Sequence, residues 1–383
     1  MSKVEPLRIV KLEAVVRYVS NIERSRKFYT SRLNFAEIGS SENDLDELGK
    51  VQTVGFEAGN VRVLCTQALK NDAQAARWHR RHPDGMGKLV FEVEDADFAF
   101  RTLEARGGTP TSDVRTFTDD GGTLKLFAIT TPFGDTEFVF VERKGYLGLY
   151  PGFERYETPR GGTNRYGFGR VDHVTSNFRT MSPALLWMTH VLGFEQFWNI
   201  EFHTQDVKVD AKKGSGLKSI VMWDPYSGVK FANNEPYRPF FEASQIAVFV
   251  EDHRGDGIQH LALDVPDILP VVRQMRADGI TFMPTPGTYY DALPQRLIDT
   301  GIGQIDEDIA TLRDLEILVD GADAQYLLQI FLNDAAATHG DRGAGPFFYE
   351  IIQRKGDQGF GGGNFRALFD SIERQQRSDG RSS

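Results

Sequence analysis

Two histidines and one glutamate in the second half of the sequence have the side chains needed to bind a catalytic metal ion. His173 lies in the segment VDHV, His260 in GIQHLAL and Glu350 in FFYEIIQR, and each segment is predicted to be a β-strand. Two imidazoles and one carboxylate form the facial triad that binds non-haem Fe(II) and leaves positions open for a substrate and oxygen. The same ligands also suit catalytic zinc, which is the alternative metal.

An internal repeat sets these three residues apart from their counterparts in the first half of the chain. KLEAV at 11–15 matches RVDHV at 170–174, GMGKLVFEVEDA at 85–96 matches GIQHLALDVPDI at 257–268, and FVFVERKG at 138–145 matches YEIIQRKG at 349–356. The counterparts are Ala14 for His173, Lys88 for His260 and Val139 for Glu350. Because all three ligand types are missing from the first half, we predict a metal site in the second half only.

Taken singly, each candidate ligand has a simpler explanation. A histidine near an apolar strand is usually a core or surface residue, and Glu350 suits the polar face of an edge strand. We assign the remaining histidines to that simpler explanation: His79, His82, His190, His203, His253 and His339. The joint placement of the three candidates on repeat-equivalent strands is what favours a metal site.

The hydrophobic pattern predicts an α+β fold in which each half reads strand, helix and three strands, twice over. Paired βαβββ modules form curved, open barrels with a cup inside and helices outside. We expect a metal-free barrel domain at 8–145, a linker at 146–169, a metal-binding catalytic domain with a terminal lid helix at 170–376, and a disordered tail at 377–383.

Composition excludes several classes of protein. The chain has 383 residues, which suits two large domains, and a net charge of -10, which disfavours binding to nucleic acid or to an anionic membrane. The single cysteine, Cys65, allows no disulfide within the chain and favours a reducing, cytoplasmic location. The sequence also shows no signal peptide and no apolar run long enough for a membrane span.

The segments VDHVTSNF, GIQHLAL, LLQIF, FFYEIIQR and GFGGGNF resemble, in this order, the 4-hydroxyphenylpyruvate dioxygenase family. The resemblance covers nearly the whole chain and is densest over 170–376. It implies a vicinal-oxygen-chelate, glyoxalase-like fold with one Fe(II) per chain, ligated by His173, His260 and Glu350. The implied reaction of tyrosine and phenylalanine catabolism converts 4-hydroxyphenylpyruvate and O2 to homogentisate and CO2, through oxidative decarboxylation, ring hydroxylation and side-chain migration.

The same resemblance implies the residues of a substrate pocket. The polar catalytic positions fall on Ser219, Asn234, Gln245, Gln259 and Gln329, and the substrate-binding positions fall on Phe331, Phe348, Phe360, Asn364 and Phe365. Phe331 and Phe365 are expected to stack on the substrate ring. Gln259 precedes a ligand, so its side chain points to the opposite face unless the backbone bulges. The glycines at 359–363 suit a hinge before a lid helix capped by Asn364.

The sequence departs from the family pattern at Ala232, where the family has proline, and in the stretch WDPY at 223–226. The sequence therefore leaves open which carbon atom of the substrate is hydroxylated. The alternative is benzylic hydroxylation of the same substrate, as in hydroxymandelate synthase, although Phe348 favours ring hydroxylation. Less favoured alternatives are an extradiol dioxygenase and a non-catalytic binding protein of the bleomycin-resistance type. The family also implies a homo-oligomer, either a dimer or a tetramer associated through the first barrel.

Overall fold

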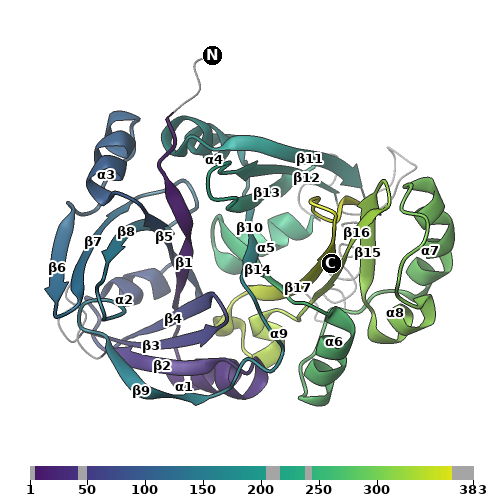
Figure 1. Cartoon of the computed structure of the whole chain (residues 1–383), viewed down its shortest axis with the longest axis horizontal. Coiled ribbons are helices and arrows are strands. Elements are labelled where there is room, and N and C mark those ends of the chain that lie inside the picture. The colour runs from purple at the N-terminus through teal and green to yellow at the C-terminus, as the bar shows by residue number, and fades with distance from the viewer. Residues whose placement is uncertain (1–4, 42–49, 204–215, 238–243, 365–383) are drawn as a thin grey trace.

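Two curled, mixed β-sheets, one from each half of the chain, make up the fold (Figure 1). The computed structural model describes residues 5–41, 50–203, 216–237 and 244–364. The expected tail at 377–383, Phe365 and the rest of the expected lid helix lie outside these described residues. The α+β fold of paired βαβββ modules predicted from the sequence is confirmed.

The first half contributes a nine-stranded sheet with the order β6-β7-β8-β5-β1-β4-β3-β2-β9. Its elements are β1 (Ile9–Tyr18), α1 (Ile22–Lys27), β2 (Ala36–Ser41), β3 (Val51–Ala58), β4 (Val61–Ala68), α2 (Gln74–His79), β5 (Gly85–Val93), α3 (Ala96–Ala105), β6 (Arg115–Asp119), β7 (Gly122–Ile129), β8 (Glu137–Lys144) and β9 (Glu154–Gly161). Strand β9 lies within the segment expected as a linker and pairs with β2.

The second half contributes an eight-stranded sheet with the order β11-β12-β13-β10-β14-β17-β16-β15. Its elements are β10 (Val171–Asn177), α4 (Ser182–Trp187), β11 (Glu195–His203), β12 (Gly216–Trp223), β13 (Lys230–Pro236), α5 (Gln245–His253), β14 (Gly257–Asp264), α6 (Ile268–Ala277), α7 (Gly287–Asp299), α8 (Ile309–Leu315), β15 (Leu318–Ala322), β16 (Gln325–Phe331), α9 (Ala335–His339) and β17 (Phe348–Lys355). Helices α7 and α8, on the outer side in Figure 1, account for the longer spacing before Glu350.

The strand register reproduces the repeat that the sequence predicts. Val16 lies opposite Lys88 where β1 pairs with β5, and Thr175 lies opposite His260 where β10 pairs with β14. The parallel pairings of β5 with β8 and of β14 with β17 correspond in the same way. The register therefore gives three equivalent pairs: Ala14 with His173, Lys88 with His260, and Val139 with Glu350.

Two β-bulges occur at equivalent places in each half. In the second sheet, the pairing of β10 with β14 skips Asp172 on one strand and Gln259 on the other. In the first sheet, the pairing of β1 with β5 skips Glu13 and Gly87 in the same way. A bulge bends the strand and turns the extra residue toward the face of its neighbour. In the second half, each bulged residue directly precedes a candidate histidine ligand.

Side-chain caps form at helix starts in both halves, whereas the cap that the sequence predicts at Asn364 is not formed. The side chains of Asn21, Asp95 and Asp267 each accept a hydrogen bond from the first turn of the following helix. The expectation that Asn364 caps the last helix is wrong. Helical backbone begins at Gly362, and the Gly363 N–H instead donates to the carboxylate of Asp320 at 2.8 Å.

Candidate metal centre

Three side chains from the central strands of the second sheet converge inside its cup. His173 comes from β10, His260 from β14 and Glu350 from β17, and one ligand atom of each lies within 4.8 Å of the others. The Glu350 Oε2 atom is 3.5 Å from His173 Nε2 and 3.3 Å from His260 Nε2. All three residues are buried. The arrangement gives two imidazole nitrogens and one carboxylate aimed at a common point.

The bulged residues fix both imidazole rings. The Nδ1 atom of His173 is 2.9 Å from Oδ1 of Asp172, and that of His260 is 3.1 Å from Oε1 of Gln259. Because a carboxylate only accepts, Nδ1 of His173 carries the proton and Nε2 presents its lone pair to the site. The Gln259 amide oxygen holds His260 in the same tautomer. Such partners orient metal-binding histidines and strengthen their binding.

Arg354 holds the carboxylate behind His173. Its Nε lies 2.7 Å from Asp172 Oδ2 and its Nη2 lies 2.7 Å from Asp172 Oδ1, so the ion pair is bidentate. The Nη1 group donates to the backbone oxygens of Asp357 and Gly359, at 3.0 and 2.8 Å. Arg354 therefore connects the first ligand to the glycine-rich segment that carries Phe360.

The electrostatics of the metal-free site keep the carboxylates ionised. Burial raises the pKa of Asp172 and of Glu350, but hydrogen bonds and neighbouring positive charge outweigh it, and both pKa values are lowered. Burial lowers the pKa of His173, yet Glu350 and Asp172 together raise it to about 8. The pKa of His260 is lowered, mainly because burial disfavours its charged form.

These residues suit a divalent metal ion. Within the described residues, the buried Oε1 atom of Glu350 has no hydrogen-bond partner. A buried carboxylate oxygen without a hydrogen-bond partner destabilises the folded protein unless a cation binds to it. The donor set of two nitrogens and one carboxylate fits Fe(II), and it also fits zinc. His173, His260 and Glu350 would hold the ion, and Asp172, Gln259 and Arg354 would hold its ligands in place.

Polar side chains form a ladder across three strands beside these ligands. Ser219 on β12 lies opposite Asn234 on β13, whose Nδ2 donates to Oδ1 of Asn177 on β10 at 3.1 Å. All three are buried. The Ser219 hydroxyl and the Asn234 Oδ1 atom have no hydrogen-bond partner among the described residues. The ladder therefore presents a donor and an acceptor that a bound molecule would satisfy.

The two remaining predicted glutamines lie at separate points of the same half. Gln245 is the first residue of α5 and is buried. Gln329 is buried on β16, two residues before Phe331, so the two side chains share one face of the sheet. The Gln329 amide packs against Gly361, where a Cβ would lie 2.6 Å from it and where φ is +64°. Only glycine fits at that position.

Three predicted phenylalanines surround the ligands. The Phe348 ring stacks on the His260 ring with centroids 4.7 Å apart, and Phe331 meets both rings edge-on. The Phe360 ring meets His173 edge-on at 5.0 Å. The fourth predicted phenylalanine, Phe365, lies outside the described residues. The described aromatic rings exclude water from two sides of the candidate site.

Asn364, predicted as substrate-binding, already has partners within the chain. Its Oδ1 accepts hydrogen bonds from the Tyr289 hydroxyl at 2.7 Å and from Arg296 at 3.3 Å. Its Nδ2 is buried with no partner among the described residues. Asn364 therefore keeps one donor for a ligand, while its acceptor anchors the glycine-rich segment to α7.

Sequence reasoning missed Asp172, Arg354 and Asn177. A signal for the first two was present, because the matched segments keep an acidic residue at 13 and 172 and an arginine at 143 and 354. No signal was present for Asn177, whose role depends on which strands are neighbours.

Comparison with known proteins agrees with this geometry. The sequence profile of the Glyoxalase/Bleomycin resistance protein/Dioxygenase superfamily matches residues 11–136 and 170–295. A 4-hydroxyphenylpyruvate dioxygenase from Dictyostelium discoideum is 33% identical over 375 residues, covering 96% of this chain and 98% of the relative. One from Caenorhabditis briggsae is 37% identical, covering 97% of this chain and 93% of the relative.

A solved structure shares the fold along the whole chain. A mutant of 4-hydroxymandelate synthase from Streptomyces coelicolor superimposes with a TM-score of 0.79 at 24% identity, covering 96% of this chain and 99% of that one. That identity supports the fold alone, whereas the sequence relatives are closer and nearly full-length. The chain therefore belongs to the Glyoxalase/Bleomycin resistance protein/Dioxygenase superfamily and, within it, to the family of 4-hydroxyphenylpyruvate dioxygenases.

Proposed function

We propose that this protein is an Fe(II)-dependent dioxygenase that converts 4-hydroxyphenylpyruvate and O2 to homogentisate and CO2. The observation that carries the proposal is the buried cluster of His173, His260 and Glu350 in a chain of this family. One Fe(II) per chain is the metal we assign to it. When bound, Fe(II) supplies the open positions and the electrons needed to bind the 2-oxo acid and activate O2.

The protein's own contribution begins with the orientation of the ligands. Asp172 and Gln259 hold the Nδ1 protons of the two histidines, so that both Nε2 atoms face the same point. Arg354 keeps Asp172 ionised and fixed. Three rigid ligands on one side of the cup leave the opposite side for the substrate.

We assign the substrate to the space between the ligands and the polar ladder. Its 2-oxo acid head lies toward His173, His260 and Glu350. The Ser219 hydroxyl and the Asn234 amide have unused hydrogen-bonding atoms for its polar groups. Gln245, Gln329 and Asn364 are the further polar groups that we place in this pocket. Neutral donors suit a phenol and a carboxylate because they add no competing charge.

The aromatic residues position the ring and exclude water. Phe331 and Phe348 pack against His260, and Phe360 packs against His173, so a substrate ring beside them is desolvated. Offset or edge-on aromatic contacts each add about 1 kcal/mol beyond the burial of area. Holding the ring next to the site of oxygen activation favours its hydroxylation over side reactions with water.

The most detailed part of the proposal is which carbon atom of the substrate is hydroxylated. Phe348 on the ring of His260 supports ring hydroxylation. At the family's proline position, Ala232 forms a small apolar cluster with Val221 and Phe360. The smaller side chain therefore borders the aromatic wall at Phe360, whose ring also contacts His173.

A product assay tests the proposal. Protein purified without oxygen is given Fe(II), 4-hydroxyphenylpyruvate and air, and the products are identified by mass spectrometry. We expect homogentisate and CO2 in equal amounts. 4-Hydroxymandelate would move the assignment to benzylic hydroxylation, and a ring-fission product from catechols would indicate an extradiol enzyme. No turnover by protein that carries one iron per chain would contradict the proposal.

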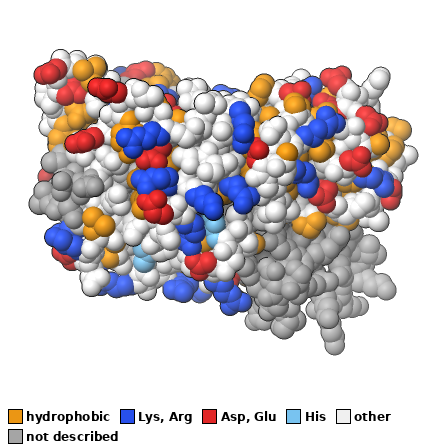
Figure 2. All heavy atoms as spheres, turned by 90° about the horizontal axis from the view of Figure 1, so that it is seen from below, with side chains coloured by type: hydrophobic (Ala, Val, Ile, Leu, Met, Phe, Trp, Pro, Cys, Tyr) orange, Lys and Arg blue, Asp and Glu red, His pale blue; other side chains and the backbone are white. Residues whose placement is uncertain are grey.

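The proposal also covers the oligomeric state and the cellular location of the protein. We infer a homo-oligomer, either a dimer or a tetramer, on the basis of the family resemblance alone, and a cytoplasmic location on the basis of the single buried cysteine. Among the helices in the described ranges, none has the length and apolar character needed to cross a bilayer. On the face in Figure 2, acidic and basic side chains are interspersed and hydrophobic ones are scattered.

A further inference from the structure

A small cavity lies where the two barrels meet. Its volume is about 20 Å³. Residues of β1 and α1 in the first half line it, including Arg17 and nearby Tyr29, and the second half completes it with residues around α9 and before β17, including His339 and Phe347. Figure 1 shows α1 and α9 at this junction. The cavity has room for one species of about the size of a water molecule.

Arg17 brings a buried positive charge to this cavity. The residue is only 6% exposed. Its Nη1 donates to the Tyr29 hydroxyl at 3.1 Å, and the guanidinium carbon lies 4.6 Å from the centroid of the Phe347 ring. Its Nε atom is buried and has no hydrogen-bond partner among the described residues. The guanidinium therefore contacts neutral groups and keeps at least one unused donor.

The side chains around Arg17 do not supply a negative charge. Within the described parts of the chain, Arg17 forms no ion pair with a carboxylate. Burial raises the pKa of the Tyr29 hydroxyl to about 12 and that of the Cys65 thiol to about 12, so both groups stay neutral at pH 7. A buried cation without a counter charge strongly destabilises the folded state.

The other charges at the cavity balance one another. Arg24 and Asp84 both line it and form an ion pair of 2.5 Å. Asp84 also accepts a hydrogen bond from the backbone N–H of Ser20 at 2.8 Å, and Arg24 has a second ion pair with Asp341 at 2.5 Å. The described lining therefore holds two arginines and one carboxylate, and the charge of Arg17 is the one left over.

His339 adds an uncharged donor on the side of the second barrel. Burial and the nearby charges of Arg24 and Arg17 lower the pKa of His339 below its ordinary value, so the ring is neutral at pH 7. Its ring lines the cavity and meets the Phe28 ring edge-on at 5.6 Å. A neutral imidazole keeps one N–H, which can donate to a bound anion.

The fold itself does not require a cation at this position. Arg17 lies beside Cys65 on β4 as Ser176 lies beside Asn233 on β13, so Ser176 is the counterpart of Arg17 in the second half. Ser176 is fully buried. The second barrel is therefore built with an uncharged residue at this place, and the buried charge is specific to the first half.

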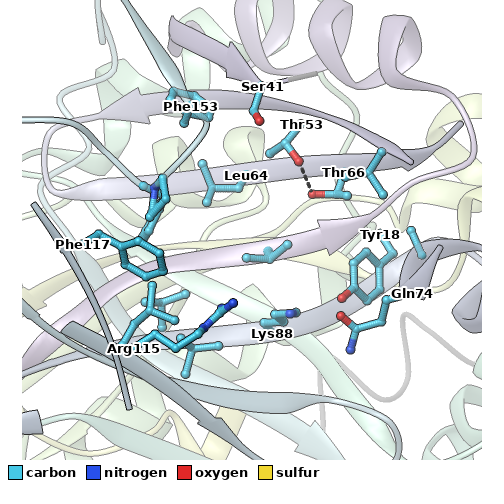
Figure 3. Close-up of a pocket in the computed structure, with 18 residues that line it drawn as sticks. Tyr18, Ser41, Thr53, Leu64, Thr66, Gln74, Lys88, Arg115, Phe117 and Phe153 are labelled. Carbon is cyan, nitrogen blue, oxygen red and sulfur yellow. Dashed lines mark hydrogen bonds between the residues drawn. The ribbon is translucent and has the colours of Figure 1, made fainter. Parts of the chain in front are cut away.

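The larger cavity in the cup of the first barrel is different. It has a volume of about 140 Å³ and lies beside Lys88 (Figure 3). Lys88 is 3.3 Å from Glu137, and the guanidinium of Arg115 lies 5.5 Å from the centroid of the Phe117 ring. Both cations of this cup have partners. The cup therefore does not call for an anion, whereas the cavity beside Arg17 does.

We propose that the cavity between the barrels binds one chloride ion, held by Arg17 and His339. Chloride carries the single negative charge needed to balance the arginine, accepts hydrogen bonds from several directions, and is close to water in size. Because both halves of the chain contribute to the site, the bound ion should stabilise the junction of the barrels. The inference rests on Arg17 and the cavity, and it does not depend on the reaction proposed for the second barrel.

Thermal unfolding of the full-length protein in two salts tests the proposal. Sodium chloride and sodium gluconate are compared at the same ionic strength, so that surface ion pairs are screened equally. Gluconate is too large for the cavity. We expect Tm to rise by about 2 °C for each tenfold increase in chloride once the site is saturated, with no such rise in gluconate. Equal Tm values in the two salts would overturn the proposal.

A crystallographic map gives the position of the ion. Crystals grown in sodium bromide and measured at the bromine absorption edge should show an anomalous peak in contact with the Arg17 guanidinium. A water molecule at that place, or bromide peaks only at the surface, would contradict the proposal. A peak at Arg17 without a chloride-dependent Tm would show binding at crystal concentration only, which also contradicts it.

Variants connect the chloride effect to Arg17. Arg17→Met keeps the length of the side chain and removes its charge, so the rise of Tm with chloride should be lost. Arg62→Met is the matched control, because Arg62 is a partly buried arginine of the same barrel that has ion pairs with Glu13 at 3.1 Å and Glu57 at 2.8 Å. Its Tm should still rise with chloride.

A rise kept in Arg17→Met, or lost in Arg62→Met, would place the chloride effect elsewhere and overturn the proposal. If Arg17→Met does not fold, Arg17→Gln takes its place, and the bromide map of the parent protein needs no variant. Turnover is not a readout, so failure here is distinct from failure of the proposed reaction.

Discussion

Arg354 donates two hydrogen bonds, each of 2.7 Å, to the carboxylate of Asp172, directly behind His173. Its counterpart in the first half, Arg143, lies 2.9 Å from Glu13, the counterpart of Asp172. The ion pair that supports His173 in the second barrel therefore has an equivalent in the first barrel, although only the second barrel has the histidine. The two halves differ at the centre of the cup, and the frame around that centre is shared.

Removal of any one metal ligand should abolish metal binding and turnover. His173→Ala, His260→Ala and Glu350→Ala each leave two donors, too few to hold a divalent ion firmly on one face. Metal content per chain after dialysis against Fe(II) should fall from one in the parent protein to near zero. His190→Ala, at a histidine of the second half outside the cluster, is the control and should keep its metal.

Loss of the carboxylate behind His173 should weaken metal binding without removing a ligand. Asp172→Asn should lower metal affinity by about 10- to 100-fold, because the ring loses its partner and its basicity. Glu13→Gln breaks the equivalent ion pair in the first barrel. It should leave metal affinity unchanged while lowering the free energy of unfolding by about 3 kcal/mol. Equal loss of metal affinity in both variants would contradict a local role for Asp172.

Metal affinity should depend on pH through His173. Its pKa in the metal-free protein is raised to about 8, so the ring is protonated below that pH and must lose a proton to bind metal. We expect affinity to fall by about tenfold for each pH unit below about 8. Asp172→Asn removes one of the charges that raise this pKa, so the fall should begin at lower pH. Titrations with Co(II) at pH 6, 7 and 8.5 measure the effect.

The polar ladder should act on substrate binding and not on metal binding. Ser219→Ala and Asn234→Ala should each raise KM about tenfold, the value of one hydrogen bond in a buried site. Iron content should stay at the level of the parent protein. If either substitution lowers the iron content instead, the residue supports the metal centre and does not contact the substrate.

The buried histidine pair between the barrels should make stability depend on pH. Burial lowers the pKa of His253 to about 4, below its ordinary value of about 6.5. The unfolded chain therefore binds a proton that the folded chain does not, and stability is lost as the pH falls from about 6.5 to about 4. The loss amounts to roughly 3 kcal/mol. Urea unfolding across this range should show it, and His253→Phe, which keeps the stacking on Phe249, should reduce it.

The three ligand candidates were predictable because the repeat offered an internal comparison. His173, His260 and Glu350 stand where the first half has residues of other types, and that difference is visible in the sequence. Asp172 and Arg354 were missed for the opposite reason. Acidic and basic residues occupy their positions in both halves, so the difference between the halves that marked the three ligands did not mark them. Their repetition was the only signal in the sequence, and they are 182 residues apart in the chain.

The role of Gln259 could not be settled from the sequence. In a regular strand, Gln259 and His260 would point to opposite faces, and only the bulge brings them together. The bulge arises where β10 and β14 pair, so it depends on a partner strand far away in the sequence. The longer second half was also visible as a larger spacing, but its physical form, helices α7 and α8, required the structure.

The most direct test of the central claim is an anomalous diffraction map of the iron-loaded protein, measured at the iron absorption edge. The account predicts one peak per chain, bonded to Nε2 of His173, Nε2 of His260 and a carboxylate oxygen of Glu350, with no peak in the cavity beside Lys88. A peak elsewhere in the chain, or these three side chains turned apart with no peak between them, would contradict it.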